Sequence, residues 1–402
     1  MSRALPEDPF IRSLVQQAQR AQFSRRHILK GAGIGAAALA LAACSSTGVT
    51  KPKSAKDVSD TDKTVRWDNW ALYLDVDEAG NYPTLEAFEK KTGIKATYTE
   101  AVDDNNTYYG KVKDQLKLGQ DIGCDTVCLT DWMVDRLIRF GYTQKFDDAN
   151  IPNKKNLVPA LKDVDFDPGR KMSLPWQGGF AGIAWNKDQL PGGLKSVSDL
   201  WDKSLKGRVG VLSEMRDTMG CIMQDLGTQI DGKWGDDDYS AAIDVLQKQV
   251  DDGQIRNIKG NSYKEDLQNG DTLAAIVWSG DITQLNAEAG DHWEFAIPTK
   301  GGTLWNDNFV IPVGSDHKKN AETLINYYYD PEVAAQVAAY VNYIPPVSGT
   351  KEAMMALDPE LADNQLIFPS DETLKKAHVF RSLSSSEEQK YSTQFQAILL
   401  GA

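Results

Sequence analysis

The sequence contains few cysteines and few histidines. The 402-residue chain has four of each. Four cysteines are too few for a disulfide framework, and no set of Cys and His has the spacing of a zinc site, so we expect no metal. Cys124 and Cys128, in the apolar stretch GCDTVCLT, are expected to be small core residues.

Basic residues and catalytic motifs are also scarce. The chain has 44 Lys and Arg against 57 Asp and Glu, a formal net charge of -13. This balance argues against a nucleic-acid partner and permits a cationic ligand. The patterns GxSxG, HExxH and the long phosphate loop do not occur. We therefore expect no catalytic residues and no cofactor. The enzyme alternative is a hydrolase that uses a pair of carboxylates.

The one long apolar run lies near the N-terminus and has the features of an export signal. Arg25 and Arg26 precede Gly31–Ala43, GAGIGAAALALAA, and Cys44 follows directly. About 13 residues are short for a spanning helix of roughly 20, and no strand precedes the glycines to make a phosphate loop. We predict a signal peptide over residues 1–43. The paired arginines resemble a twin-arginine signal, and LAAC resembles a bacterial lipobox, which implies lipid on the thiol of Cys44.

The segment after this signal is polar. Residues 44–63 contain almost no large apolar side chains, which favours a flexible tether. No later segment is apolar enough to span a membrane. The sequence thus predicts a body outside the cytoplasm, in the cell envelope, held to the membrane by lipid.

From Val65 onward, strand patterns alternate with helical patterns. Strands are expected in WDNWALYL, IKATYTEA, CDTVCLT, TLWNDNFVIPVG and LAAIVWSGD, the last ending in a glycine turn. Helices are expected in YPTLEAFEKKTG, ended by Gly93, in DWMVDRLIRFG, in KSVSDLWDKSLKG, with Ser198 as N-cap, and in DPEVAAQVAAYVNY, with Asp330 as N-cap and Pro331 at the first position. The alternation indicates an α/β fold with mainly parallel sheets, in two lobes with a ligand site at strand ends between them.

Aromatic residues recur beside acids or amides at the expected strand ends. The chain has ten Trp, and the pattern occurs in NWALY, TDW, WSGD and WND. Trp305 and Asp307, two residues apart, share a face of a strand. Glu214 and Asp217, three apart, share a face of a helical turn. Each case alone is also compatible with a core Trp beside a strand-end acid, and Arg216 could pair with either acid. Together they indicate a site for a ligand with apolar stretches and positive ends.

Seven stretches occur in a specific order and spacing: WDNWALYLD, CDTVCLTDWMVDRL, SLPWQGGFAGIAWN, GRVGVLSEMRD, LAAIVWSGD, GGTLWNDNFVIPVG and NYIPPVSG. In this arrangement the chain resembles the spermidine/putrescine-binding proteins of bacterial ABC importers, over nearly all of residues 65–402. The resemblance implies a two-lobed, type II periplasmic-binding-protein fold with the ligand cleft between lobes joined by a hinge. Lobe 1 would comprise residues 64–175 and 299–345, and lobe 2 residues 176–298 and 346–402.

The resemblance also implies ligand-binding residues. Trp70, Tyr73 and Trp305 would line the aliphatic chain of the ligand, and Trp278 would do so from the other lobe. Tyr343, in the segment returning to the hinge, would close one side.

The polar residues of the family's site also have counterparts. By resemblance, Asp307 would hold an ammonium group near the middle of the ligand, and Glu214 and Asp217 would hold a terminal one. Thr130 and Trp132 stand where the family usually has Ser and Tyr.

The function implied is that of a monomeric, lipid-anchored receptor that binds putrescine or spermidine. It would deliver the polyamine to the permease and ATPase subunits of an ABC importer and would not itself be an enzyme.

Phe380 stands where the family has a Gln at the distal end of the ligand, which puts the preferred polyamine length in doubt. One alternative keeps the fold and binds another organic cation or an amino-acid derivative. The remote alternative is the exported carboxylate-dependent hydrolase.

Overall fold

The computed structural model describes residues 51–401, so the predicted signal peptide, residues 1–43, and the predicted lipidation site, Cys44, lie outside the described residues. Within this range the strands are β1 (Thr64–Trp70), β2 (Lys95–Val102), β3 (Thr126–Thr130), β4 (Leu174–Asn186), β5 (Val209–Leu212), β6 (Ile255–Lys259), β7 (Ala274–Trp278), β8 (Trp293–Ala296), β9 (Gly302–Val310) and β10 (Ala377–His378). The α-helices are α2 (Pro83–Thr92), α3 (Asn105–Leu118), α4 (Asp131–Phe140), α5 (Met215–Asp225), α6 (Asp236–Asp251), α7 (Tyr263–Gln268), α8 (Ser279–Ala289), α9 (Lys318–Tyr328), α10 (Pro331–Val341), α11 (Thr350–Leu357), α12 (Pro359–Ala362), α13 (Asp371–Leu374) and α14 (Ser385–Leu399).

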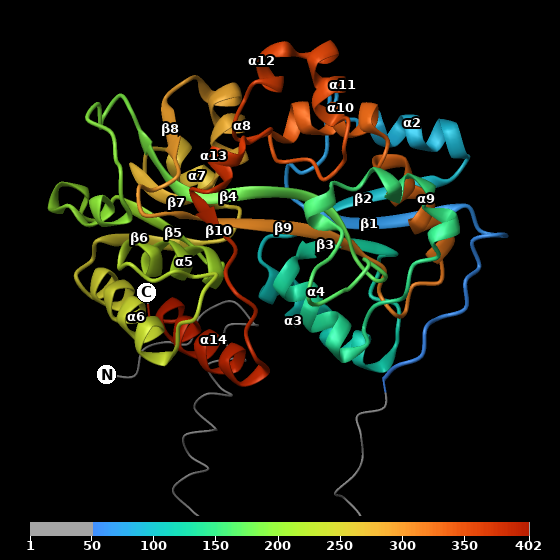
Figure 1. Ribbon diagram of the computed structural model, residues 1–402, viewed down its shortest axis with the longest axis horizontal. Helices are drawn as coiled ribbons and strands as arrows, with labels where there is room; N and C mark the ends of the chain where they lie inside the picture. Colours follow the sequence, from blue (N-terminus) through green and yellow to red (C-terminus); the bar gives the residue numbers. More distant parts are fainter. Residues whose placement is uncertain (1–50, 402) are drawn as a thin grey trace, which may run out of the picture. The chain divides into compact units, whose positions relative to one another are not determined.

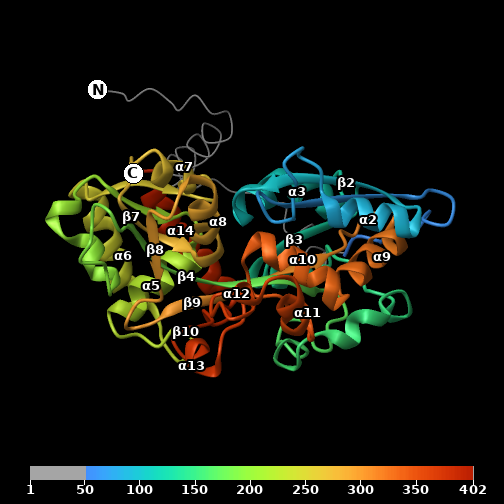
Figure 2. The same cartoon turned by 90° about the horizontal axis from the view of Figure 1, so that it is seen from above.

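The strands pair in the order β2-β1-β3-β9-β4-β7-β5-β6, with β8 beside β4 and β10 beside β9. The long strands β4 and β9 run antiparallel through the middle and connect two halves of the sheet (Figure 1). We call β2, β1 and β3 the first half and β7, β5 and β6 the second half. Figure 2 shows α2, α3 and α9 grouped around the first half, and α5, α6 and α7 around the second. The expected two-lobed α/β architecture is confirmed, while the residue boundaries of the lobes stay a prediction.

The alternating pattern predicts a mainly parallel sheet, and this prediction is wrong. The sheet of the structure is mixed. Each half is internally parallel, with β1 between β2 and β3, and β5 between β6 and β7. The pairs of β9 with β3 and β4, and of β4 with β7 and β8, are antiparallel. Alternating helix and strand predicts the parallel halves, but the direction of the two long connecting strands depends on long-range pairing.

Local signals placed most helix ends correctly. Gly93 ends α2 in the left-handed conformation, with its N–H bonded to the carbonyl of Glu89, and the side chain of Asp330 caps α10. The helix predicted in KSVSDLWDKSLKG is wrong: two 3₁₀ turns, Val197–Trp201 and Lys203–Leu205, replace it, with N-caps at Ser196 and Asp202 and not at Ser198. The side chain of Asp202 accepts the N–H of Ser204 and starts a new turn, which competes with helix continuation.

The glycine turn predicted after β7 is likewise wrong, because α8 begins at Ser279 and Gly280 lies in its first turn. The cysteine prediction is confirmed, since Cys124 and Cys128 are free and buried in the core.

The predicted tether lies partly on the body. The N–H groups of Ala55 and Val58 donate to the carbonyls of Val313 and Asp316, and Asp60 pairs with Lys319 at 2.9 Å. Ordered backbone hydrogen bonds are not expected of a flexible linker, so the described residues 51–63 depart from the predicted tether. Across residues 51–401, no helix combines the length and apolarity needed to cross a membrane.

Candidate functional site

Four predicted site residues mark the carboxyl ends of strands: Trp70 ends β1, Thr130 ends β3, Glu214 follows β5 by two residues and Trp278 ends β7. In α/β sheets such strand ends meet at a cleft. Helices α4, α5 and α8 begin beside three of these ends, and their first turns carry Asp131, Asp217 and Asp281. A helix N-terminus attracts anions. Here the anions are the protein's own carboxylates, in the first turns of the three helices. The negative charge that they bring to the strand ends suits a cationic ligand.

A cavity of about 290 Å³ lies at this position. It is lined by all ten predicted ligand-binding residues: Trp70, Tyr73, Thr130, Trp132, Glu214, Asp217, Trp278, Trp305, Asp307 and Tyr343. The cavity volume is at the small end of ligand pockets. The structure therefore brings the predicted residues together from both halves of the sheet; their roles toward a ligand stay predictions.

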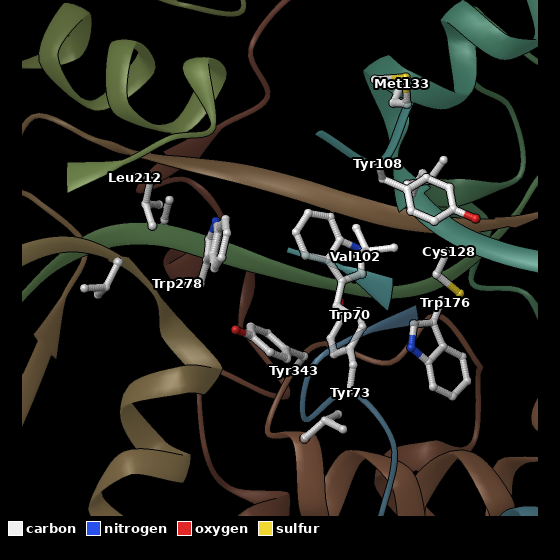
Figure 3. Packing of buried hydrophobic residues seen from close by; sticks show 14 of the residues in the cluster. Trp70, Tyr73, Val102, Tyr108, Cys128, Met133, Trp176, Leu212, Trp278 and Tyr343 are labelled. Atoms are coloured by element: carbon white, nitrogen blue, oxygen red, sulfur yellow. The ribbon is translucent and has the colours of Figure 1, made fainter. Parts of the chain in front are cut away.

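Aromatic rings form much of the cavity wall. Figure 3 shows the rings of Trp70, Tyr73, Trp278 and Tyr343 close together, although they come from separate elements. The ring centroids of Trp70 and Trp278 are 5.9 Å apart, and those of Tyr73 and Tyr343 are 5.4 Å apart, both edge to face. A Cβ at Gly280 would lie 2.7 Å from the Tyr343 ring, so any larger residue there would displace this ring from its present position. Such faces pack on methylene groups and attract ammonium groups.

Asp307 is the central carboxylate of the cavity. Its side chain on β9 is buried, and Oδ1 accepts a hydrogen bond of 2.7 Å from the hydroxyl of Thr130 on β3. Burial raises the pKa of Asp307 to about 7, against the lowering effect of the Thr130 bond. Loss of water disfavours the charged form, so a bound cation would restore it.

The two acids of α5 are held by neutral donors. Asp217 accepts from the hydroxyl of Thr303 at 2.6 Å and from Nε1 of Trp278 at 2.9 Å, which also fixes the Trp278 ring. Glu214 accepts from the N–H and Nδ2 of Asn105 at 2.9 and 2.8 Å. Burial raises the pKa of both carboxyl groups. Among the described residues, neither acid forms an ion pair.

Acidic groups outnumber basic ones around the cavity, with eight carboxylates and two guanidinium groups in its lining. Arg216 does not pair directly with Glu214 or Asp217, so that alternative is wrong for the described structure. Its guanidinium lies 4.2 Å from the ring centroid of Trp132 and 3.5 Å from Glu388. Burial lowers the pKa of Arg216 to about 10. The surplus of carboxylates suits a ligand with more than one positive charge.

Sequence reasoning missed several groups around this cavity. Asp131 and Asp281 lie in quoted motifs, and their place in a first helical turn after a strand could have identified them. Glu388 on α14 also lines the cavity and pairs with Arg136 and Arg139 of α4 at 2.9 and 3.0 Å. No local pattern marks Glu388, because its partners lie about 250 residues away in sequence.

Phe380 also lines the cavity. The resemblance described above implies that this position lies at the distal end of the ligand. Its ring packs edge-on against Trp234, with centroids 5.2 Å apart. An apolar group therefore stands at this part of the wall.

Comparison with known proteins agrees with this geometry. Residues 84–369 match the model of the bacterial extracellular solute-binding protein family. The spermidine/putrescine-binding periplasmic protein of Escherichia coli (strain K12) is 30% identical over 321 residues, which cover 79% of this chain and 86% of that protein.

Solved structures give the same assignment. A putative spermidine/putrescine ABC transporter protein from Listeria monocytogenes superposes with a TM-score of 0.74 at 26% identity, covering 85% of this chain and all of that one. The substrate-binding protein PotD from Streptococcus pneumoniae gives a TM-score of 0.67 at 26% identity, covering 84% of this chain and 98% of that one. The cavity between the two sheet halves has a wall of aromatic and acidic residues, and the family model matches most of the chain. The chain therefore belongs to the bacterial extracellular solute-binding proteins.

Proposed function

We propose that this protein is a lipid-anchored receptor that captures a polyamine outside the cytoplasm and presents it to an ABC importer. The observation that carries the proposal is the cavity itself, where Glu214, Asp217 and Asp307 accept hydrogen bonds only from neutral groups of the described chain, between aromatic rings. Unpaired buried carboxylates are costly unless a cation joins them. The names of the curated relatives point to putrescine and spermidine as that cation.

In this proposal Asp307 holds an amine near the middle of the cavity, and Asp217 and Glu214 hold a terminal amine. The rings of Trp70, Tyr73, Trp278, Trp305 and Tyr343 cover the methylene chain. Tyr73 supports this role, because its buried hydroxyl lies close enough to Asp307 to lower the pKa of that carboxyl, and its oxygen can accept from an ammonium. The family consists of solute-binding proteins, so the hydrolase alternative has no support from it.

The test is titration calorimetry on the protein lacking residues 1–44, with putrescine, spermidine and spermine as ligands and arginine and thiamine as controls. We expect saturable binding of one polyamine at micromolar affinity or tighter, about -8 kcal/mol or more favourable. Absence of binding by all three polyamines, with binding of a control, would assign the site to another cation or an amino-acid derivative.

The lipid anchor and the monomeric state are part of the proposal. We expect the full chain in the membrane fraction, Cys44→Ser in the soluble fraction after export, and a single-chain mass in solution. Membrane retention of Cys44→Ser would refute the anchor and leave the binding function intact.

A further inference from the structure

A side chain outside the cavity wall connects two of its carboxylates. Asn105, the first residue of α3, is fully buried and was not identified from the sequence. Its N–H and Nδ2 both donate to Oε1 of Glu214, at 2.9 and 2.8 Å. Nδ2 also donates to the hydroxyl of Thr130 at 2.8 Å, and Oδ1 accepts the N–H of Thr130 at 3.2 Å. Every polar atom of the Asn105 amide is therefore used.

These contacts form a continuous chain of hydrogen bonds. From Asn105 the chain continues through the Thr130 hydroxyl to Oδ1 of Asp307 at 2.7 Å. Glu214 follows β5 in the second half of the sheet, whereas Asn105 and Thr130 belong to the first half. One amide thus links carboxylates from the two sides of the cavity.

The segment around Asn105 contacts the second half at further points. The hydroxyl of Ser213 donates to Oδ2 of Asp104 at 2.9 Å, and the N–H of Asn261 donates to the carbonyl of Asp103 at 3.3 Å. A Cβ at Gly260 would lie 2.3 Å from that same carbonyl oxygen, so only glycine permits the approach. The segment Asp103–Asn105 is therefore a docking point between the two halves.

Separation of the halves would break these contacts together. Glu214 would lose both donors from Asn105, and Thr130 would lose the amide that holds its hydroxyl toward Asp307. We propose that Asn105 is a positioning residue that couples closure of the cleft to the orientation of Glu214 and Asp307. This inference rests on the proposed function, since it assumes that both carboxylates meet a cationic ligand.

The first experiment compares Asn105→Ala with the unchanged protein by calorimetry with putrescine and spermidine. Loss of the Nδ2 hydrogen bond to Glu214 predicts weakening of about tenfold to a hundredfold for whichever amine binds. A double-mutant cycle with Glu214→Gln, and another with Thr130→Val, should each be non-additive, because Asn105 contacts both partners. Asn320→Ala is the matched control: Asn320 is equally buried, but bonds to the carbonyls of Asp62 and Thr64. Affinity unchanged in Asn105→Ala, or lost equally in Asn320→Ala, would overturn the inference.

A second measurement needs no ligand and separates the inference from the proposed function. Tryptophan fluorescence of the ligand-free protein is titrated between about pH 5 and 9. In Asn105→Ala, Glu214 keeps the backbone N–H of residue 105 but lacks the Nδ2 donor to its charged form, so the titration midpoint should move to higher pH. Asn105→Ser, which keeps the same backbone N–H and adds a short hydroxyl as a second donor, should show a smaller shift. If no amine binds the unchanged protein, the proposed function fails while this shift still supports the coupling. An identical midpoint in all variants would refute the coupling even if polyamines bind.

Discussion

Thr130 and Asp307 are directly opposite each other on the antiparallel strands β3 and β9, and the Thr130 hydroxyl donates a 2.7 Å hydrogen bond to the Asp307 carboxylate. This pair joins the first half of the sheet to one of the two long connecting strands. It holds the central acid of the cavity in one orientation.

Replacement of Asp307 by Asn should weaken polyamine binding by about 1.5–3 kcal/mol, the range for a hydrogen bond to a charged group. The amide has nearly the same shape but carries no charge to attract an ammonium. Calorimetry measures the change, and Asp237→Asn on the exposed face of α6 is the control. Equal affinities of Asp307→Asn and the unchanged protein would remove Asp307 from the site.

Binding should also depend on pH near neutrality. The pKa of Asp307 is raised to about 7 by burial, so its carboxyl becomes neutral as the pH falls through this value. Affinity should then decrease by up to about tenfold per pH unit below 7. The slope should be smaller in Asp307→Asn. A flat profile of the unchanged protein between about pH 6 and 8 would contradict the raised pKa.

The same pKa has an opposite effect on the ligand-free fold. Because the folded pKa of Asp307 exceeds its ordinary value of 3.8, the folded state binds this proton more tightly than the unfolded state. The contribution of Asp307 to the stability of the ligand-free protein should therefore fall as the pH rises from 3.8 to about 7, and should be constant above that range. Thermal unfolding of the unchanged protein and of Asp307→Asn isolates the contribution, and a polyamine at saturation should abolish it.

Thr130→Val should lower affinity by about 0.5–1.5 kcal/mol, the net worth of one hydrogen bond, while keeping the side-chain shape. Since the Thr130 bond lowers the pKa of Asp307, its loss should move the pH midpoint of binding upward. Both effects are read from calorimetry over a pH series. Thr130→Ser retains the hydroxyl and should behave like the unchanged protein; similar losses in both variants would indicate a packing effect instead.

Glu388→Gln should destabilise the fold. The carboxylate of α14 bridges Arg136 and Arg139 of α4, and its pKa is lowered mainly by these and Arg216, against the effect of burial. Urea unfolding should show a loss of about 1.5–3 kcal/mol at neutral pH. The loss should shrink in acid, because stability from a lowered pKa disappears once the group is protonated. Glu372→Gln, at an exposed position of α13, is the control; an equal effect there would remove the bridge from the explanation.

Phe380→Gln should change the choice of polyamine. The ring contributes only apolar surface to the cavity wall, whereas an amide could accept a hydrogen bond from a further amine. We expect spermidine to gain about 0.5–1.5 kcal/mol relative to putrescine. Competition calorimetry gives the ratio directly. An unchanged ratio would place the ligand away from this end of the cavity.

Much of the cavity wall could be predicted because it follows strand ends. Trp70, Thr130 and Trp278 each close a short apolar strand, and the helical spacing of Glu214 and Asp217 correctly put them on one turn. These are local patterns, and the sheet brings local strand ends to one edge by its topology. The family resemblance added Tyr343, which no local pattern identifies.

Asn105 and Glu388 could not be predicted in this way. Asn105 lies in a polar stretch, DDNNTYY, where several neighbours have the same chemistry. Its function depends on the approach of Gly260 to Asp103, a contact between segments far apart in the chain. The 3₁₀ turns near Ser196 show the same limitation at short range, because Ser196 and Ser198 are equally good caps by composition.

The bonded segment Lys51–Lys63 limits how far the receptor can stand from a membrane. Pro52 lies against Gly119 at the end of α3, and Lys51 against Gly141 at the end of α4. If lipid is attached at Cys44, only six residues separate it from Lys51, and even fully extended they reach on the order of 25 Å. The ends of α3 and α4 would then face the bilayer at close range. A permease in that bilayer would meet a receptor with restricted orientations, not one that rotates freely at the end of a twenty-residue chain.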